Sequence, residues 1–178
     1  MSDLKFDEEL VTVFEDAARK AFTSLREKNE KFYYYTFIFD EGMQPYVSAW
    51  SEEAYERSLA ENNIDEKDRN WWKWNYADSP YAVYGYDEFF GDVNALLKKR
   101  ASMLSDEELY DLEWNIRILS MEEAMKRLND DEFFGSGDDR KKVVINVEVA
   151  PPDGEDAARA KRLNPESTLL SLYLIYCE

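Results

Sequence analysis

The stretch Lys31-Phe-Tyr-Tyr-Tyr-Thr-Phe-Ile-Phe39 decides the fold class of this chain. After the lysine it contains only aromatic and β-branched residues, which favour an extended strand over a helix. Successive side chains of a strand point to opposite faces, and here both sets are bulky. We therefore predict a central strand over residues 31–39 that is covered on both faces.

Two more strands are predicted from this one. Asp40-Glu41-Gly42 is typical of a turn, and residues 44–50 again suit a strand, which together predict an antiparallel hairpin. A further strand is predicted over residues 142–150. Its valines and isoleucine alternate on one face, and Asn146 and Glu148 lie on the other.

Helical signals surround these strands. Residues 7–28 repeat apolar side chains at three- and four-residue spacing, which predicts an N-terminal helix. Ser105 and Ser120 each begin a capping signal, and each is expected to open a helix. Residues 167–177 fit a last helix or a final strand, and Pro165, as a first helical residue, favours the helix. Other helices are expected at about 51–62, 87–102 and 155–163.

Together these elements predict an α+β fold with a small, mainly antiparallel sheet, an N-terminal hairpin and several packing helices. The length of 178 residues suits a single domain over residues 1–178. We find no apolar run long enough to span a membrane and no secretory signal. We therefore expect a cytoplasmic protein.

The composition excludes several functions. The chain has 22 Lys plus Arg against 39 Asp plus Glu, a net charge of −17, which argues against binding nucleic acid through its phosphates. It has no histidine and one cysteine, which exclude His-dependent triads, His-ligated metals, thiolate zinc sites and an internal disulfide. We predict no catalytic residue, no metal ligand and no cofactor. The dense basic cluster Arg140-Lys141-Lys142 is expected to cap its loop and pair with nearby acids.

The aromatic run from Arg69 to Phe90 is the most unusual feature, and a charged stretch precedes it. Trp71, Trp72 and Trp74 fall within four residues, so they cannot all face one interior, and at least one is expected to be exposed. Exposed aromatic rings beside acids have the composition of an interface hot spot. We predict a partner-binding surface made of Asp65, Glu66, Asp68, Trp71, Trp72, Trp74 and Asp78.

Five motifs, in this order and spacing, resemble one known family. They are Lys31-Phe-Tyr-Tyr-Tyr-Thr-Phe-Ile-Phe-Asp40, Trp72-Lys-Trp-Asn-Tyr-Ala-Asp78, Phe89-Phe-Gly-Asp-Val-Asn94, Phe133-Phe-Gly-Ser-Gly-Asp-Asp-Arg140 and Arg162-Leu-Asn-Pro165. The family is DUF4303, bacterial domains of unknown function met in loci of polymorphic toxins. The resemblance covers about residues 5–165 and carries over no catalytic residues. It implies an immunity protein that neutralises a toxin in the cytoplasm.

These observations favour a binding protein over an enzyme. We expect an immunity protein that occludes the active site of a cognate toxin, because a basic active site attracts an acidic partner. Neither nucleic acid nor membrane is an expected partner, and the free protein is expected to be a monomer or a weak homodimer. Two alternatives remain: a small carboxylate-based enzyme, possibly metal-dependent, and an acidic DNA-mimic binding protein.

Overall fold

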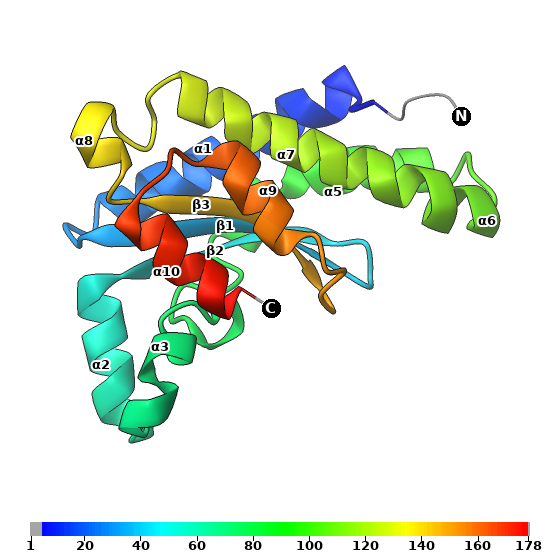
Figure 1. The fold of residues 1–178 in the computed structure, drawn as a ribbon. Coiled ribbons are helices and arrows are strands. Elements are labelled where there is room, and N and C mark those ends of the chain that lie inside the picture. The colour runs from blue at the N-terminus through cyan, green and yellow to red at the C-terminus, as the bar shows by residue number, and fades with distance from the viewer. Residues whose placement is uncertain (1–4, 178) are drawn as a thin grey trace.

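The computed structural model describes residues 5–177 and has an α+β architecture (Figure 1). A three-stranded sheet with the order β2-β1-β3 forms its centre. The strands are β1 (Phe32–Asp40), β2 (Pro45–Ser51) and β3 (Val144–Ala150). The longer helices are α1 (Glu8–Arg26), α2 (Glu52–Asn62), α5 (Gly91–Ala101), α7 (Trp114–Asp130), α9 (Asp156–Leu163) and α10 (Thr168–Tyr176).

The short elements connect these helices. They are η1 (Glu66–Asp68), α3 (Arg69–Trp72), η2 (Tyr76–Asp78), α4 (Tyr86–Phe89), α6 (Asp106–Glu108), the π-helix η3 (Leu109–Glu113) and α8 (Gly137–Arg140). The helix expected at 87–102 is divided into α4 and α5 at Phe90. Phe90 leaves helical geometry there, is fully buried, and packs edge-on against Phe37.

The sheet is mixed, which corrects the expectation of a mainly antiparallel one. The hairpin is confirmed, because β1 and β2 are antiparallel, with Phe37 opposite Val47. β3 instead runs parallel to β1, with Phe37 opposite Val147. The helices between β2 and β3 carry the chain across the sheet, so β3 enters in the direction of β1.

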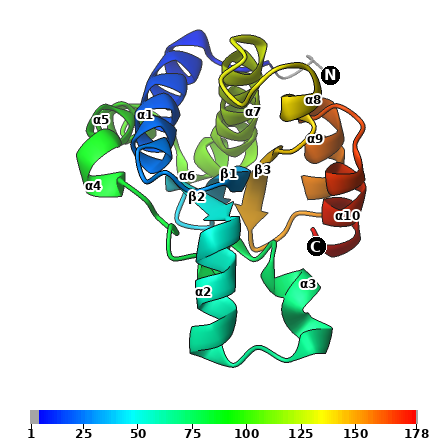
Figure 2. The ribbon, with the colours of Figure 1, turned by 90° about the vertical axis from the view of Figure 1, so that its left-hand side faces the viewer.

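Helices cover β1 on both faces, as its sequence predicts. On one face Phe37 meets Phe14 of α1, with ring centroids 5.6 Å apart. On the other face the ring of Tyr34 lies 5.5 Å from those of Trp74 and Tyr173. Figure 2 shows α1 and α7 above the sheet, and α9 and α10 beside β3. Every residue from 33 to 39 is therefore buried.

The outer edges of the sheet are closed by side chains and a loop. On β3, Asn164 pairs with the backbone of Ile145 in both directions, at 2.9 and 2.6 Å, and Arg159 Nε donates to the Val147 carbonyl at 2.7 Å. On β2, the Tyr84 N–H donates to the Val47 carbonyl at 3.1 Å. These contacts use backbone groups that a neighbouring strand would otherwise use.

The two serine signals have different outcomes. Ser105 opens α6 with a complete capping box, in which Ser105 and Glu108 each accept the other's backbone N–H. The expected helix start at Ser120 is wrong, because Ser120 lies buried inside α7. Its hydroxyl donates to the Ile116 carbonyl at 2.7 Å and accepts from the Asp7 N–H at 2.9 Å. The serine therefore joins two helices and does not begin one.

We expect Ser105→Ala to lower the free energy of unfolding by about 1 kcal/mol, because the exposed Glu108 N–H loses its acceptor. Urea unfolding measures this. Ser136→Ala is the matched control, because Ser136 precedes α8 without a side-chain capping bond. Equal losses in the two variants would contradict the assigned cap.

The C-terminal segment is a helix, as the capping pattern favoured, although Pro165 is not its first residue. α10 begins at Thr168, and the Ser167 hydroxyl caps it by accepting from the Leu170 N–H at 3.0 Å. Within residues 5–177, no helix combines the length and the apolar character needed to cross a membrane.

The basic cluster is divided between surface and interior. Lys141 and Lys142 pair with Asp138 and Asp139, as expected of the cluster. Arg140 is buried and forms no ion pair with a carboxylate of residues 5–177. It donates to the Val143 carbonyl at 2.6 Å, the Leu163 carbonyl at 3.0 Å, and the side chains of Asn129 and Asn164. Burial lowers the pKa of Arg140 to about 10. Arg140 therefore connects α7, β3 and α9.

Candidate functional site

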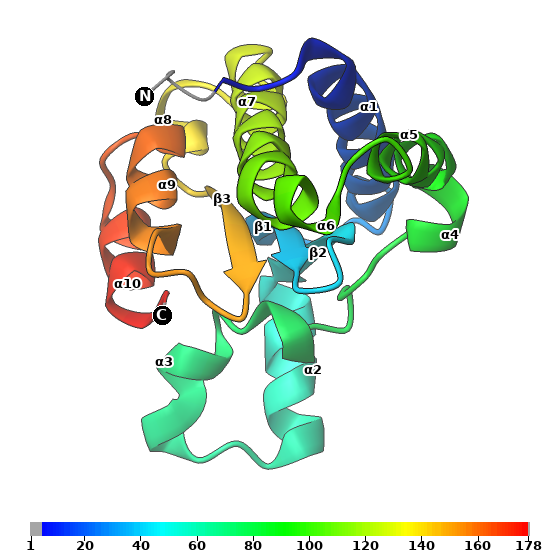
Figure 3. The same cartoon turned by 90° about the vertical axis from the view of Figure 1, so that its right-hand side faces the viewer.

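Residues 52–72, which we call the acidic arm, project from the sheet as a pair of helical segments (Figures 2 and 3). The Ser51 hydroxyl starts α2 by accepting from the Ala54 N–H at 2.9 Å. Asn63 ends α2 in the left-handed conformation, and η1 and α3 follow. Two hydrogen bonds join the segments: Trp72 Nε1 donates to the Ser58 hydroxyl at 2.9 Å, and the Tyr55 hydroxyl donates to the Arg69 carbonyl at 3.0 Å.

The negative charge of the acidic arm is only partly compensated. The arm contains seven carboxylates and three cations, and one of these cations, Arg57, is held by Glu30 at 2.8 Å. Among the described residues, Glu66 and Asp68 form no ion pair, and Asp65 lies 3.9 Å from Lys67. A field from such unpaired charges reaches into the solvent.

Elsewhere on the molecule, many surface acids are paired with cations. The pairs include Glu8 with Arg127, Asp16 with Lys20, Asp130 with Lys126, Asp138 with Lys141 and Asp139 with Lys142. The acidic arm differs from these paired surfaces, but it is not alone in this, because Asp106, Glu107 and Asp111 are also exposed and form no ion pair with a described residue.

The structure separates the residues of the predicted partner-binding surface. Trp71 lies on the arm and is 46% exposed, which confirms that one tryptophan of the run is exposed. Trp72 is half-buried between the two segments of the arm, and Trp74 is buried against Tyr34. Asp78 is exposed but lies on η2, beside β2. The other three predicted residues are exposed on the arm: Asp65, Glu66 and Asp68.

At the base of the arm, β3 carries a buried carboxylate that is not among the predicted contact residues. Glu148 is 4% exposed, and its Oε1 accepts from the hydroxyls of Tyr34 and Tyr173. Within the described residues, Glu148 Oε2 has no hydrogen-bond partner. Desolvation raises the pKa of Glu148 to about 7, although the two tyrosine hydroxyls lower it.

Glu148 lines a cavity of about 130 Å³ at the base of the arm. Trp74, also in the wall, has a buried indole N–H without a partner in the described part of the chain. Two more buried side-chain oxygens lack a hydrogen-bond partner among the described residues, Thr36 Oγ1 and Asn146 Oδ1. These two residues face each other on β1 and β3. The aromatic and acidic walls of the cavity are Trp71, Trp74, Tyr76, Glu148, Asp156 and Tyr176.

A larger cleft of about 1020 Å³ lies near the first residues of β1 and β3. Its walls include Phe32, Phe134 and Leu172, and two of its three lysines, Lys141 and Lys142, are paired with acids. None of the unpartnered buried atoms described above belongs to its walls. Size alone favours this cleft as the binding site of the protein, whereas the buried polar groups without partners favour the Glu148 cavity as that site. We give the second observation more weight because polar groups fix the chemistry of a site.

The family now follows from a sequence comparison. Residues 14–165 match the family described as "Domain of unknown function (DUF4303)". The chain belongs to this family. The match confirms the resemblance and includes both the acidic arm and Glu148, whereas Tyr173 on α10 lies beyond it. No curated protein and no solved structure matches the chain.

The sequence of this DUF4303 chain contains a signal for Glu148 that periodicity alone does not use. Asn146 and Glu148 are polar residues on a predicted strand, and the neighbouring strand is predicted to be covered on both faces. A strand beside it is then expected to bury its polar face as well. Within residues 5–177, no group of three or more carboxylate or cysteine side chains is placed to hold a metal ion.

Proposed function

We propose that this DUF4303 chain is an immunity protein that binds a cognate toxin and occludes the toxin's active site with the acidic arm. The observation that carries the proposal is that Glu66 and Asp68 form no ion pair with a described residue, on the same arm as the exposed ring of Trp71. The partner is a toxin with a basic active site.

The arm suits such a partner in two physical ways. Its unpaired charges steer a basic protein toward it, which raises the association rate at low ionic strength. Trp71 offers a large, partly exposed apolar ring on the same arm, and tryptophans that become buried on binding are frequent anchors of interfaces. The hydrogen bond from Trp72 to Ser58 fixes the two segments, so little ordering is needed on binding.

The test is co-expression with the toxin encoded beside this gene. Cells that carry the toxin and the wild-type chain are expected to grow. The triple variant Asp65→Lys, Glu66→Lys and Asp68→Lys is expected to lose protection, because it reverses the field of the arm. With purified proteins its association rate at low salt is expected to fall by about 10- to 100-fold.

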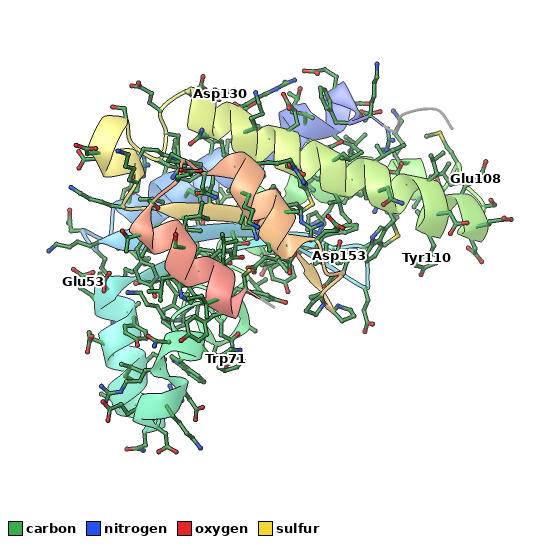
Figure 4. All side chains as sticks on the ribbon, in the orientation of Figure 1. Glu53, Trp71, Glu108, Tyr110, Asp130 and Asp153 are labelled. Atoms are coloured by element: carbon green, nitrogen blue, oxygen red, sulfur yellow. The ribbon has the colours of Figure 1, made fainter. Side chains whose placement is uncertain are left out.

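A matched triple variant controls for net charge. Asp106→Lys, Glu107→Lys and Asp111→Lys reverse three exposed acids at the other end of the molecule, near Glu108 and Tyr110 in Figure 4. This variant is expected to protect like the wild type. The proposal fails if the wild-type chain gives no protection, and the assignment to the arm fails if both triple variants protect equally.

A further inference from the structure

The Glu148 cavity has an incomplete set of hydrogen bonds. Glu148 is 4% exposed and Trp74 3%, and each has a polar atom that no described residue satisfies. Native proteins rarely leave buried polar groups unpaired, so such a pair in one cavity wall indicates a bound water, ion or ligand. The cavity volume of about 130 Å³ exceeds that of one water several-fold, because a water occupies about 30 Å³ in the liquid.

The charges around the cavity favour a cation. Glu148 and Asp156 line the cavity, and Asp153 and Asp156 pair with the same arginine, Arg159. Arg159 is the cation of this group, and it is held by Asp153 at 2.7 Å and by Asp156. One arginine therefore balances part of the negative charge, and ionised Glu148 is left with an uncompensated charge in a low-dielectric cavity.

The walls of the cavity favour an organic cation over a bare metal ion. Trp71, Trp74, Tyr76 and Tyr176 line it, and the faces of aromatic rings attract ammonium groups. A metal ion would need more oxygen ligands than these walls supply. Trp71 and Pro152 are exposed, so the cavity opens to solvent at their side.

We propose that the Glu148 cavity binds an organic ammonium group, with Glu148 Oε2 accepting one of its N–H bonds and the aromatic rings enclosing its alkyl carbons. An ammonium group has three donors and no acceptor, which suits an unpartnered carboxylate oxygen. The Trp74 N–H is itself a donor and pairs with a water beside the ligand. A free amine and the lysine of a protein present the same group, so the site does not depend on the toxin proposal.

Calorimetric titration of the full chain at about pH 8 tests the proposal with three probes. These are n-butylammonium chloride, Nα-acetyl-lysine methylamide, and the same lysine compound acetylated on Nε. The first two are expected to bind, and the acetylated compound to bind at least about tenfold more weakly because its charge is lost. Tighter binding of butylammonium points to a free amine as the natural ligand, and tighter binding of the lysine compound points to a protein lysine.

Two variants assign the binding to this cavity. Glu148→Gln is expected to weaken binding by about tenfold or more, because it removes the charge but keeps the shape. Trp71→Ala is expected to weaken binding, because it removes one aromatic wall of the cavity. Trp71 is 46% exposed, so the variant is expected to fold. The control is Asp130→Asn, which removes one exposed charge that lies far from Trp71 in Figure 4 and outside the cavity walls, and this variant is expected to bind like the wild type.

The pH dependence gives an independent readout. As the pH falls from about 8 to 6, protonation of Glu148 is expected to weaken binding by roughly tenfold, since its pKa is about 7. The other groups that act on Glu148 or lie beside it are Tyr34, Tyr46, Tyr76, Asp156, Arg159, Tyr173 and Cys177. Glu148→Gln leaves all of them in place, so the pH dependence is expected to disappear in this variant.

Three outcomes would overturn the proposal: no binding of either amine to the folded wild-type chain, equal binding of the acetylated compound, or unchanged binding to Glu148→Gln. The toxin proposal would be unaffected, because its test uses the arm variants and not the amines.

Discussion

Replacing Arg140 with methionine is expected to lower the free energy of unfolding by about 3 kcal/mol or more. Its buried guanidinium donates to the carbonyls of Val143 and Leu163 and to the side chains of Asn129 and Asn164. Methionine fills a similar length without any donor, so these buried acceptors lose their partner in the interior. Urea unfolding, followed by circular dichroism, measures the loss.

Lys141→Met is the matched control for this variant. Lys141 is the next residue, its side chain is 52% exposed, and among the described residues its one ion-pair partner is exposed Asp138. Its replacement is expected to leave the unfolding midpoint almost unchanged, because exposed ion pairs contribute little. A small loss for Arg140→Met, similar to that of Lys141→Met, would show that Arg140 does not organise the junction of α7, β3 and α9.

Glu148→Gln is expected to remove a large pH dependence of stability. The folded chain raises the pKa of Glu148 from 4.5 to about 7, so the folded state binds this proton more tightly than the unfolded state. The resulting stabilisation is fully present below about pH 4.5 and is lost as the pH rises through 7. The gap between the two pKa values corresponds to about 3 kcal/mol.

The measurement is the free energy of unfolding of both proteins at about pH 5 and pH 8. Between these values the wild type is expected to lose about 2.5 kcal/mol relative to Glu148→Gln, because at pH 5 the effect is not yet complete. Asp7, Glu30 and Asp153 have lowered pKa values and act in the opposite direction at lower pH, but they are present in both proteins. Parallel pH profiles of the two proteins would contradict the burial of an ionisable Glu148.

Much of the fold can be predicted from local patterns, because one residue type often decides one element. The aromatic stretch at 31–39 gives a buried central strand, and Ser105 with Glu108 gives a capping box. Ser120 shows the limit of this reasoning. The residues that follow Ser120 match the pattern of a helix start, but a tertiary hydrogen bond with Asp7 decides the role of Ser120. The direction of β3 depends in the same way on the whole crossover and not on its own residues.

The candidate site likewise contains residues that local sequence predicts and residues whose position depends on tertiary contacts. Four of the seven predicted contact residues lie exposed on the acidic arm, because charged residues and a crowded aromatic run leave some side chains at the surface. Trp74 is buried because Tyr34 and Tyr173 enclose it, and no spacing in sequence predicts that Tyr173 lies there. The polar face of β3 indicates that Glu148 is buried, but its two hydrogen-bond partners come from β1 and α10 and do not follow from its neighbours in sequence.

The closed edges of the sheet have a consequence for the behaviour of the protein at high concentration. A strand as rich in aromatic and β-branched residues as β1 is typical of segments that form amyloid-like fibres when they are exposed. Here β1 is the middle strand, and side chains from α9 and a loop occupy part of the outer backbone of its two neighbours. A second molecule therefore finds few free backbone groups on which to add a strand, and the aromatic sequence that specifies the fold is kept from driving self-assembly.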